Sequence, residues 1–255
     1  MHVGWGALPA IVLAMGCAAP SSPPSPSPSQ PPGGPLPSQP VRVLLLTATA
    51  DFRHDSIATA VQVMTDLATP TGMAVTATEN LSDISAQRLQ GVNVLMFALT
   101  SGELALDDGQ RRAIADFVNG GGGFIGVHSA ADTLYDWPEY GRLVGAYFKE
   151  HPWTQPATVV VEDRAHAIAA GLGASFTLME EFYTFRDNPR SSVHVLLSLD
   201  AASVSAQGDY PLAWTQSIGR GRSYYNALGH FDTTWRNPQF QSQLIAAVRW
   251  VSGKS

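Results

Sequence analysis

Apolar residues between positions 41 and 127 alternate between short continuous runs and runs with helical spacing. Residues 41–47 form a nearly unbroken run of valine and leucine, which is typical of a strand buried on both faces. After Asp55 or Ser56, either of which can cap a helix, apolar side chains recur on one helical face as far as Ala68. Strands are expected at residues 41–47, 73–78, 92–99 and 124–127, and helices at residues 56–68, 85–89 and from Asp107 to the glycine tract that starts at Gly120. Strands that alternate with helices predict a parallel sheet with helices on both faces.

The pattern from His151 onward is less regular, because polar and aromatic residues interrupt the apolar runs. Shorter strands are expected at residues 158–162, 196–199, 212–215 and 222–227, and an apolar-periodic helix at residues 238–251. No internal repeat accompanies these elements.

Polar side chains follow several of the predicted strands directly. Arg53 and His54 follow the first strand, residues 100–103 follow the third, and residues 128–132 follow the fourth. Ligands of parallel α/β sheets bind beyond the carboxyl ends of the strands, so these three segments are expected to line one edge.

The stretch GGGGFIGVHSAADTLYDW at residues 120–137 organises this edge. Four glycines lead into an apolar run that stops at His128, and small residues follow. A sharp turn from a buried strand tolerates little bulk and projects one polar side chain. That side chain would be His128, although a glycine-rich turn beside a structural histidine would have the same pattern.

The first 40 residues have a different composition. Residues 1–17 contain an apolar core too short to span a bilayer, and they end in Ala-Met-Gly-Cys, which resembles the lipobox of a bacterial lipoprotein signal. Cys17, the only cysteine, would become the lipidated first residue of the mature chain. Residues 18–40 are rich in proline and serine and are expected to form a disordered tether. The alternatives are a secretory signal without lipid and a start site slightly misplaced in the sequence.

Charge narrows the choice of ligand. The chain carries 15 Lys plus Arg and 21 Asp plus Glu, a formal net charge of −6, with no basic run. This balance argues against nucleic-acid binding. Arginines in the candidate segments occur singly, which suits an anionic or hydroxyl-rich small ligand.

Four stretches together resemble one known family. They are TATADFRHDSI at residues 47–57, GGGFIGVHSAADTLYDWPEYGRLVGAYFKEHP at 121–152, EEFYTF at 180–185 and GRGRSYYNALGH at 219–230. In this order and spacing they resemble the ThuA-like, or trehalose utilisation, family. The resemblance covers residues 41–251 and implies a ThuA-like domain over residues 41–252. The implied fold is α/β, a flavodoxin-like sandwich with a parallel central sheet, similar to class I glutamine amidotransferases.

Glutamine amidotransferase chemistry itself is excluded by the residue at the turn. In that fold the turn after the glycine-rich strand carries a catalytic cysteine, whereas here the turn carries His128 and no cysteine follows Cys17. A thiolate nucleophile is therefore absent. Ser129 could act as an oxygen nucleophile only with a base and an oxyanion hole.

Histidines and carboxylates in the resembling motifs are the candidates for catalysis. His128, His54, Glu181 and Asp132 are the expected catalytic residues, since imidazole and carboxylate groups serve as general acids and bases. Of the adjacent Glu180 and Glu181, strand alternation allows only one to face the cleft, and the family pattern favours Glu181. The cofactor is open: His54, His128 and His230 are candidate ligands of a divalent metal such as zinc, although no short His-x-x-x-His spacing supports it.

The expected substrate is a small carbohydrate. Aromatic faces and polar groups suit sugar rings, and the candidate binding residues are Arg53, Trp137, Tyr183, His151, His230, Trp214 and Arg222. The sequence thus favours a hydrolase- or lyase-type enzyme of trehalose, disaccharide or keto-sugar metabolism, anchored by lipid in the bacterial cell envelope. A non-catalytic carbohydrate-binding lipoprotein, an interaction domain and a secreted protein are the alternatives.

Overall fold

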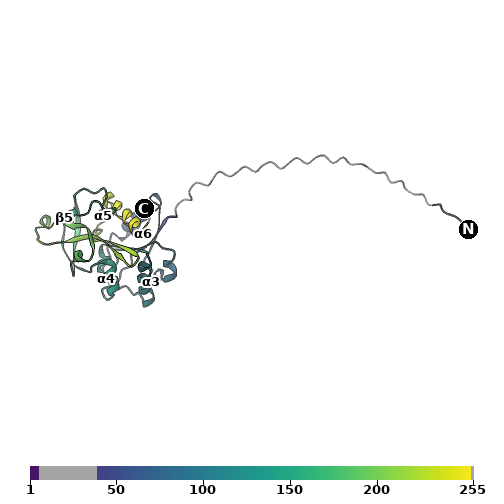
Figure 1. Cartoon of the computed structure of the whole chain (residues 1–255), viewed down its shortest axis with the longest axis horizontal. Coiled ribbons are helices and arrows are strands. Elements are labelled where there is room, and N and C mark those ends of the chain that lie inside the picture. The colour runs from purple at the N-terminus through teal and green to yellow at the C-terminus, as the bar shows by residue number, and fades with distance from the viewer. Residues whose placement is uncertain (6–38, 254–255) are drawn as a thin grey trace. The chain divides into compact units, whose positions relative to one another are not determined.

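A nine-stranded sheet, counted over the residues that the computed structural model describes (1–5 and 39–253), forms the centre of the fold (Figure 1). Its order is β2-β1-β3-β4-β9-β8-β7-β5-β6. The strands are β1 (Val41–Leu46), β2 (Met73–Thr78), β3 (Val94–Ala98), β4 (Gly123–Val127), β5 (Phe148–Val161), β6 (Ser175–Phe185), β7 (His194–Leu199), β8 (Pro211–Ile218) and β9 (Gly221–Asn226).

The sheet has a parallel half and an antiparallel half. Strands β2, β1, β3, β4 and β9 are parallel neighbours, in the order typical of flavodoxin-like proteins. Strands β8, β7, β5 and β6 then continue the sheet with antiparallel pairing. The mixed α/β fold with a mostly parallel inner sheet is the expected fold class, and the antiparallel extension is the part that the first half of the sequence does not indicate.

Helices cover both faces of the parallel half. They are α1 (Ile57–Ala68), α2 (Ala86–Leu89), α3 (Asp108–Asn119), α4 (Pro138–Val144), α5 (Asp232–Arg236) and α6 (Pro238–Ser252). In Figure 1, α3 and α4 lie on one side of the sheet and α5 and α6 on the other. Every residue of β3 and β4 is buried between these layers, which explains their unbroken apolar sequences.

Most of the elements expected in the parallel half are present within one or two residues. Asp107 opens α3 as predicted, with a capping box that it forms with Gln110. The expected cap of α1 is wrong in detail, because Ser56 occupies the cap position without bonding to the helix backbone. The sequence pattern did not indicate α4 or α5, and of β6 it indicated only that Glu180 and Glu181 lie on a strand.

The first half of β5 was also missed, since only residues 158–162 were expected as a strand there. Residues 148–156 contain Pro152 and Pro156 and are mostly exposed, so no apolar alternation marks them. They pair with β6 alone. Val159 and Val160 pair with both β6 and β7, and Val161 pairs with β7 only. Residues 148–158 and 177–185 therefore form a hairpin that extends beyond the sheet, here called the β5–β6 arm.

The β5–β6 arm must bend back over the sheet. β6 lies five strand positions from β4, which in a flat sheet is roughly 24 Å at about 4.8 Å a strand. Yet Glu181 of β6 lies 3.4 Å from His128, which directly follows β4. Two register shifts in β5, between Phe148 and Glu150 and between Glu150 and Trp153, provide local bends of the kind that bulges introduce.

The predicted signal of residues 1–17 and tether of residues 18–40 fall mainly on residues 6–38, which lie outside the described residues. Within residues 1–5 and 39–253, no helix combines the length and the apolar character needed to cross a membrane.

Candidate functional site

The turn after β4 places His128 at the centre of the site. His128 has a φ of +53°, in the left-handed region that non-glycine residues seldom adopt. Its backbone oxygen accepts a hydrogen bond from Tyr225 Oη at 2.8 Å, which helps to hold this conformation. The sharp turn is as expected, but the His128 side chain is fully buried rather than projected into solvent.

One hydrogen bond fixes which ring nitrogen of His128 carries the proton. Its Nδ1 lies 2.8 Å from the carbonyl oxygen of Ala227. Because a carbonyl oxygen can only accept, Nδ1 carries the proton and donates. In the neutral ring, the lone pair of Nε2 therefore points into the site, where a metal or a proton can bind it.

Three side-chain atoms meet around this lone pair. His128 Nε2 lies 3.4 Å from Glu181 Oε2 and 3.3 Å from His230 Nδ1. The third distance, between His230 Nδ1 and Glu181 Oε2, is 3.2 Å. The three atoms thus form a nearly equilateral triangle.

His54 completes the group from the loop that follows β1. One nitrogen or oxygen atom from each of His54, His128, Glu181 and His230 lies within 4.8 Å of the other three. We call these four residues the histidine cluster. The sequence named all four, and the fold brings them together from four separate segments.

Strand alternation separates the two neighbouring glutamates, as expected. Glu181 reaches the histidine side chains, whereas the fully buried Glu180 turns to the backbone of the loop after β9. Glu180 accepts hydrogen bonds from the amides of Gly229 and His230, at 2.9 and 3.0 Å. It also accepts one from Thr234 Oγ1 at 2.7 Å, so Glu180 fixes the loop that carries His230.

Burial and neighbouring charge shift the pKa values in the cluster. Burial, with the nearby His128 and His230, lowers the pKa of His54 to about 3, so this ring is neutral at pH 7. For Glu181, burial favours the neutral form, but contacts with His128 and His230 outweigh it and lower the pKa. For His230, burial is likewise outweighed by the contact with Glu181, which raises the pKa.

The spacing of the cluster suits a tetrahedral metal ion. Zinc bonds of about 2.0–2.1 Å separate ligand atoms by roughly 3.3–3.4 Å in a regular tetrahedron. The three distances of 3.2–3.4 Å among His128, Glu181 and His230 match this edge length. Neutral imidazoles and a carboxylate are also the donor types that zinc prefers, so the residues present fit the ion.

Ser129 contacts His54 within the site. Its hydroxyl lies 3.4 Å from His54 Nδ1, and Ser129 is fully buried. A base is therefore present beside Ser129, but the fully buried hydroxyl presents no surface to a substrate.

His151 and Tyr183 border the cluster. His151 Nδ1 lies 3.3 Å from Glu181 Oε1, and half of the His151 side chain is exposed. The Tyr183 ring packs 4.3 Å from the ring of His128 and is almost fully buried. Asp132 accepts a 2.5 Å hydrogen bond from Tyr135 Oη and does not orient His128, whose Nδ1 already donates to Ala227.

Four other predicted binding residues have partners elsewhere. Both terminal guanidinium nitrogens of Arg53 donate to the carboxylate of Glu79, at 2.7 and 3.1 Å. Trp214 is fully buried and donates to Val144 O, and Arg222 donates to Trp250 O. Trp137 is buried and stacks on Tyr140. The expectation that these four side chains surround a sugar finds no support in their contacts.

Sequence reasoning missed Glu180 as the anchor of the His230 loop and Phe52 as a neighbour of His54. The Phe52 ring lies 4.8 Å from the His54 ring. The position of Phe52 in the motif, two residues before His54, was the only sequence signal that it lies near the site. A phenylalanine near a histidine in sequence does not show, however, that its ring is exposed.

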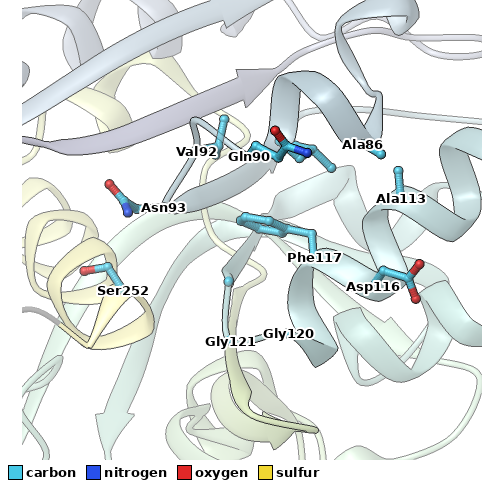
Figure 2. A pocket seen from close by; sticks show the side chains of 12 residues that line it. Ala86, Gln90, Val92, Asn93, Ala113, Asp116, Phe117, Gly120, Gly121 and Ser252 are labelled. Carbon is cyan, nitrogen blue, oxygen red and sulfur yellow. The ribbon is translucent and has the colours of Figure 1, made fainter.

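A cavity of about 420 Å³ lies at the opposite edge of the sheet (Figure 2). Asn93, which precedes β3, and Gly120 and Gly121, which precede β4, help to line it, and the ring of Phe117 projects into it. Asp116 is the one ionisable residue of its lining. The cavity therefore lacks the paired acid and base groups that the histidine cluster offers.

Solved structures resemble the whole folded region. A protein described as ThuA-like from Bacteroides uniformis ATCC 8492 is 25% identical, with 86% of this chain and 95% of that chain covered and a TM-score of 0.71. A second one, from Parabacteroides merdae ATCC 43184, is 19% identical over 85% and 91% of the two chains, with a TM-score of 0.70. A β-galactosidase from Bacillus circulans sp. alkalophilus shares the fold at 16% identity and a TM-score of 0.55, over 85% of this chain and 32% of its own.

Among curated proteins no sequence matches the chain. The comparison with family models, however, matches residues 42–251 to ThuA, the family described as trehalose utilisation. That match spans the sheet, the β5–β6 arm and all four cluster residues, and it agrees with the motifs recognised in the sequence. The chain belongs to the ThuA family.

Proposed function

We propose that this chain is a metal-dependent enzyme acting on a small carbohydrate or sugar derivative. The observation that carries the proposal is the triangle of His128 Nε2, Glu181 Oε2 and His230 Nδ1, with sides of 3.2–3.4 Å. The carbohydrate class is supported by the trehalose utilisation family.

The chain's own residues divide the work. His128, Glu181 and His230 would hold the ion, and His54 lies close enough to be the fourth ligand or the base beside it. A zinc ion held by these residues would supply Lewis-acid chemistry, that is, polarisation of a substrate oxygen or a lower pKa of a bound water. His151, half exposed and 3.3 Å from Glu181, would pass a proton between the site and solvent.

We also propose that Cys17 carries lipid and holds the domain at the cell envelope. The support is the lipobox-like sequence before Cys17 and the proline-rich segment after it, and both lie outside the described residues.

The test combines metal analysis with turnover on the purified full chain. We expect about one zinc per chain in the wild type and a metal affinity more than about 100-fold lower in His128→Ala, because even outer-shell changes cost 10–100-fold. Disaccharides and keto-sugars would be screened for products by mass spectrometry, with and without added zinc.

His194→Ala is the matched control, since His194 pairs with Asp163 outside the cluster. It should keep both metal and turnover. Full metal content or unchanged turnover in His128→Ala would refute the proposal. Metal and sugar binding without any product would instead indicate a sugar-binding protein.

A further inference from the structure

The aromatic residues first expected to stack on a sugar are not available to do so. Tyr183 is 3% exposed, Trp137 6% and Trp214 0%. A sugar ring stacks on an aromatic face that is open to solvent. The stacking surface of this site must therefore come from another residue.

Phe52, unlike these three residues, is exposed to solvent. Within residues 39–253, the large hydrophobic side chains that stand out as exposed are Phe52, at 60%, and Met179, at 42%. A single exposed apolar residue is ordinary, but Phe52 lies directly beside the histidine cluster. Its ring centroid is 4.8 Å from that of His54, and the two ring planes cross at 85°.

The loop that carries Phe52 is held in place by the segment that follows β3. Ser101 Oγ donates to Phe52 O at 2.6 Å, and Ala50 N donates to Ser101 O at 2.8 Å. Gly102, with a φ of +70°, packs so closely that an added Cβ would lie 2.8 Å from the Cβ of Asp51. The exposed ring thus sits on a fixed backbone, which lowers the entropy cost of using it to bind.

The neighbouring charge selects the kind of sugar. Arg53, the next residue, is the nearest cation along the chain, and both of its terminal nitrogens are already bound to Glu79. A phosphate or carboxylate near Phe52 would have to compete with Glu79 for Arg53, whereas a neutral ring would leave that ion pair intact.

We propose that Phe52 is the stacking platform for a neutral sugar ring at the histidine cluster. The C–H face of the ring would lie on the phenyl group while its hydroxyls turn toward His54 and the rest of the cluster. This inference rests on the proposed function and assigns its substrate to neutral rather than phosphorylated sugars.

The test measures binding of trehalose, cellobiose, their keto derivatives and trehalose 6-phosphate to the zinc-loaded full chain by calorimetry. For the neutral sugar that binds best, we expect Phe52→Ala to raise the Kd roughly tenfold, the size of an aromatic contact of about 1.4 kcal/mol. Phe52→Trp should bind within about threefold of the wild type, and Phe52→Leu should lie between. Zinc content should be equal in all of them, which separates stacking from damage to His54.

Phe117→Ala is the control, because Phe117 is a phenylalanine at the opposite edge of the sheet (Figure 2). It should leave the Kd unchanged. Equal binding by wild type and Phe52→Ala would overturn the platform alone, and tighter binding of trehalose 6-phosphate than of trehalose would overturn the assignment to neutral sugars. A wild type that holds zinc and binds none of these sugars would overturn the carbohydrate assignment as well.

Discussion

Glu180 is a buried carboxylate whose hydrogen-bond partners are neutral. It accepts from the amides of Gly229 and His230 and from Thr234 Oγ1, which lie in the segment that carries His230, and also from the amide of its neighbour Glu181. Such charge-assisted bonds are stronger than neutral ones, and losing a buried acceptor leaves its donors unsatisfied. Glu180 therefore acts on the site through the position of His230.

We expect Glu180→Gln to lower the free energy of unfolding by about 1–3 kcal/mol, because the new amide group places a donor among donors. Zinc affinity should also fall, since the His230 loop loses its anchor. Urea denaturation and chelator competition measure the two effects. Thr234→Val, which removes one donor and keeps the carboxylate, should have the smaller effect on both; equal zinc affinity in all three chains would show that Glu180 does not position His230.

The cluster residues could be named from sequence because each lies in a recognisable motif. Their geometry could not be, since His128 and His230 are 102 residues apart and their meeting depends on the whole sheet. Motif membership also misled: Trp214 and Arg222 lie in or beside motif segments, yet they bind Val144 O and Trp250 O. Only the burial and the hydrogen-bond partners of a side chain show whether it is structural or free to bind a substrate.

At the scale of elements, the parallel half was predictable and the antiparallel half was less so. Strands buried on both faces, such as β3 and β4, have unbroken apolar sequences that mark them. The β5–β6 arm has one exposed side, prolines and register shifts, so its sequence lacks a period. Its pairing is decided by contacts between distant segments, which a local pattern does not record.

Arg190 ties together three connections of the antiparallel half. It pairs with Glu162, which follows β5, and with Asp209, which precedes β8, at distances of 2.6–2.7 Å. The guanidinium, through these hydrogen bonds, holds the pKa of both carboxyls below their ordinary values. A lowered carboxyl pKa stabilises the fold above the unfolded pKa of about 4, and this contribution disappears as the pH falls.

Arg190→Met should therefore reduce the free energy of unfolding by about 1 kcal/mol at pH 7, a value limited by solvent exposure of the network. The difference from the wild type should shrink between about pH 5 and pH 2. Urea denaturation across this range measures it, and Arg220→Met, which removes a hydrogen bond to the carbonyl oxygen of Gly120, should show no such trend. A difference that stays constant with pH would assign the effect to packing of the side chain instead of charge.

At the scale of the whole molecule, lipid anchoring gives a separate prediction. Cys17 is the only cysteine, and the cluster ligands are nitrogen and oxygen atoms. In a bacterial host that processes lipoproteins, the wild-type chain should incorporate labelled palmitate and partition into detergent, and Cys17→Ala should do neither while keeping its zinc. An unlabelled wild-type chain recovered from the medium would favour the secretory signal without lipid.

The assembly of the histidine cluster from distant segments also has a consequence for biosynthesis. The four cluster side chains are translated far apart in time: His54 follows the first strand, and His230 follows the last. No partial product that lacks the segment after β9 can present the complete ligand set, however well its parallel half has folded. The complete ligand set of the proposed zinc ion therefore exists only after synthesis has passed His230.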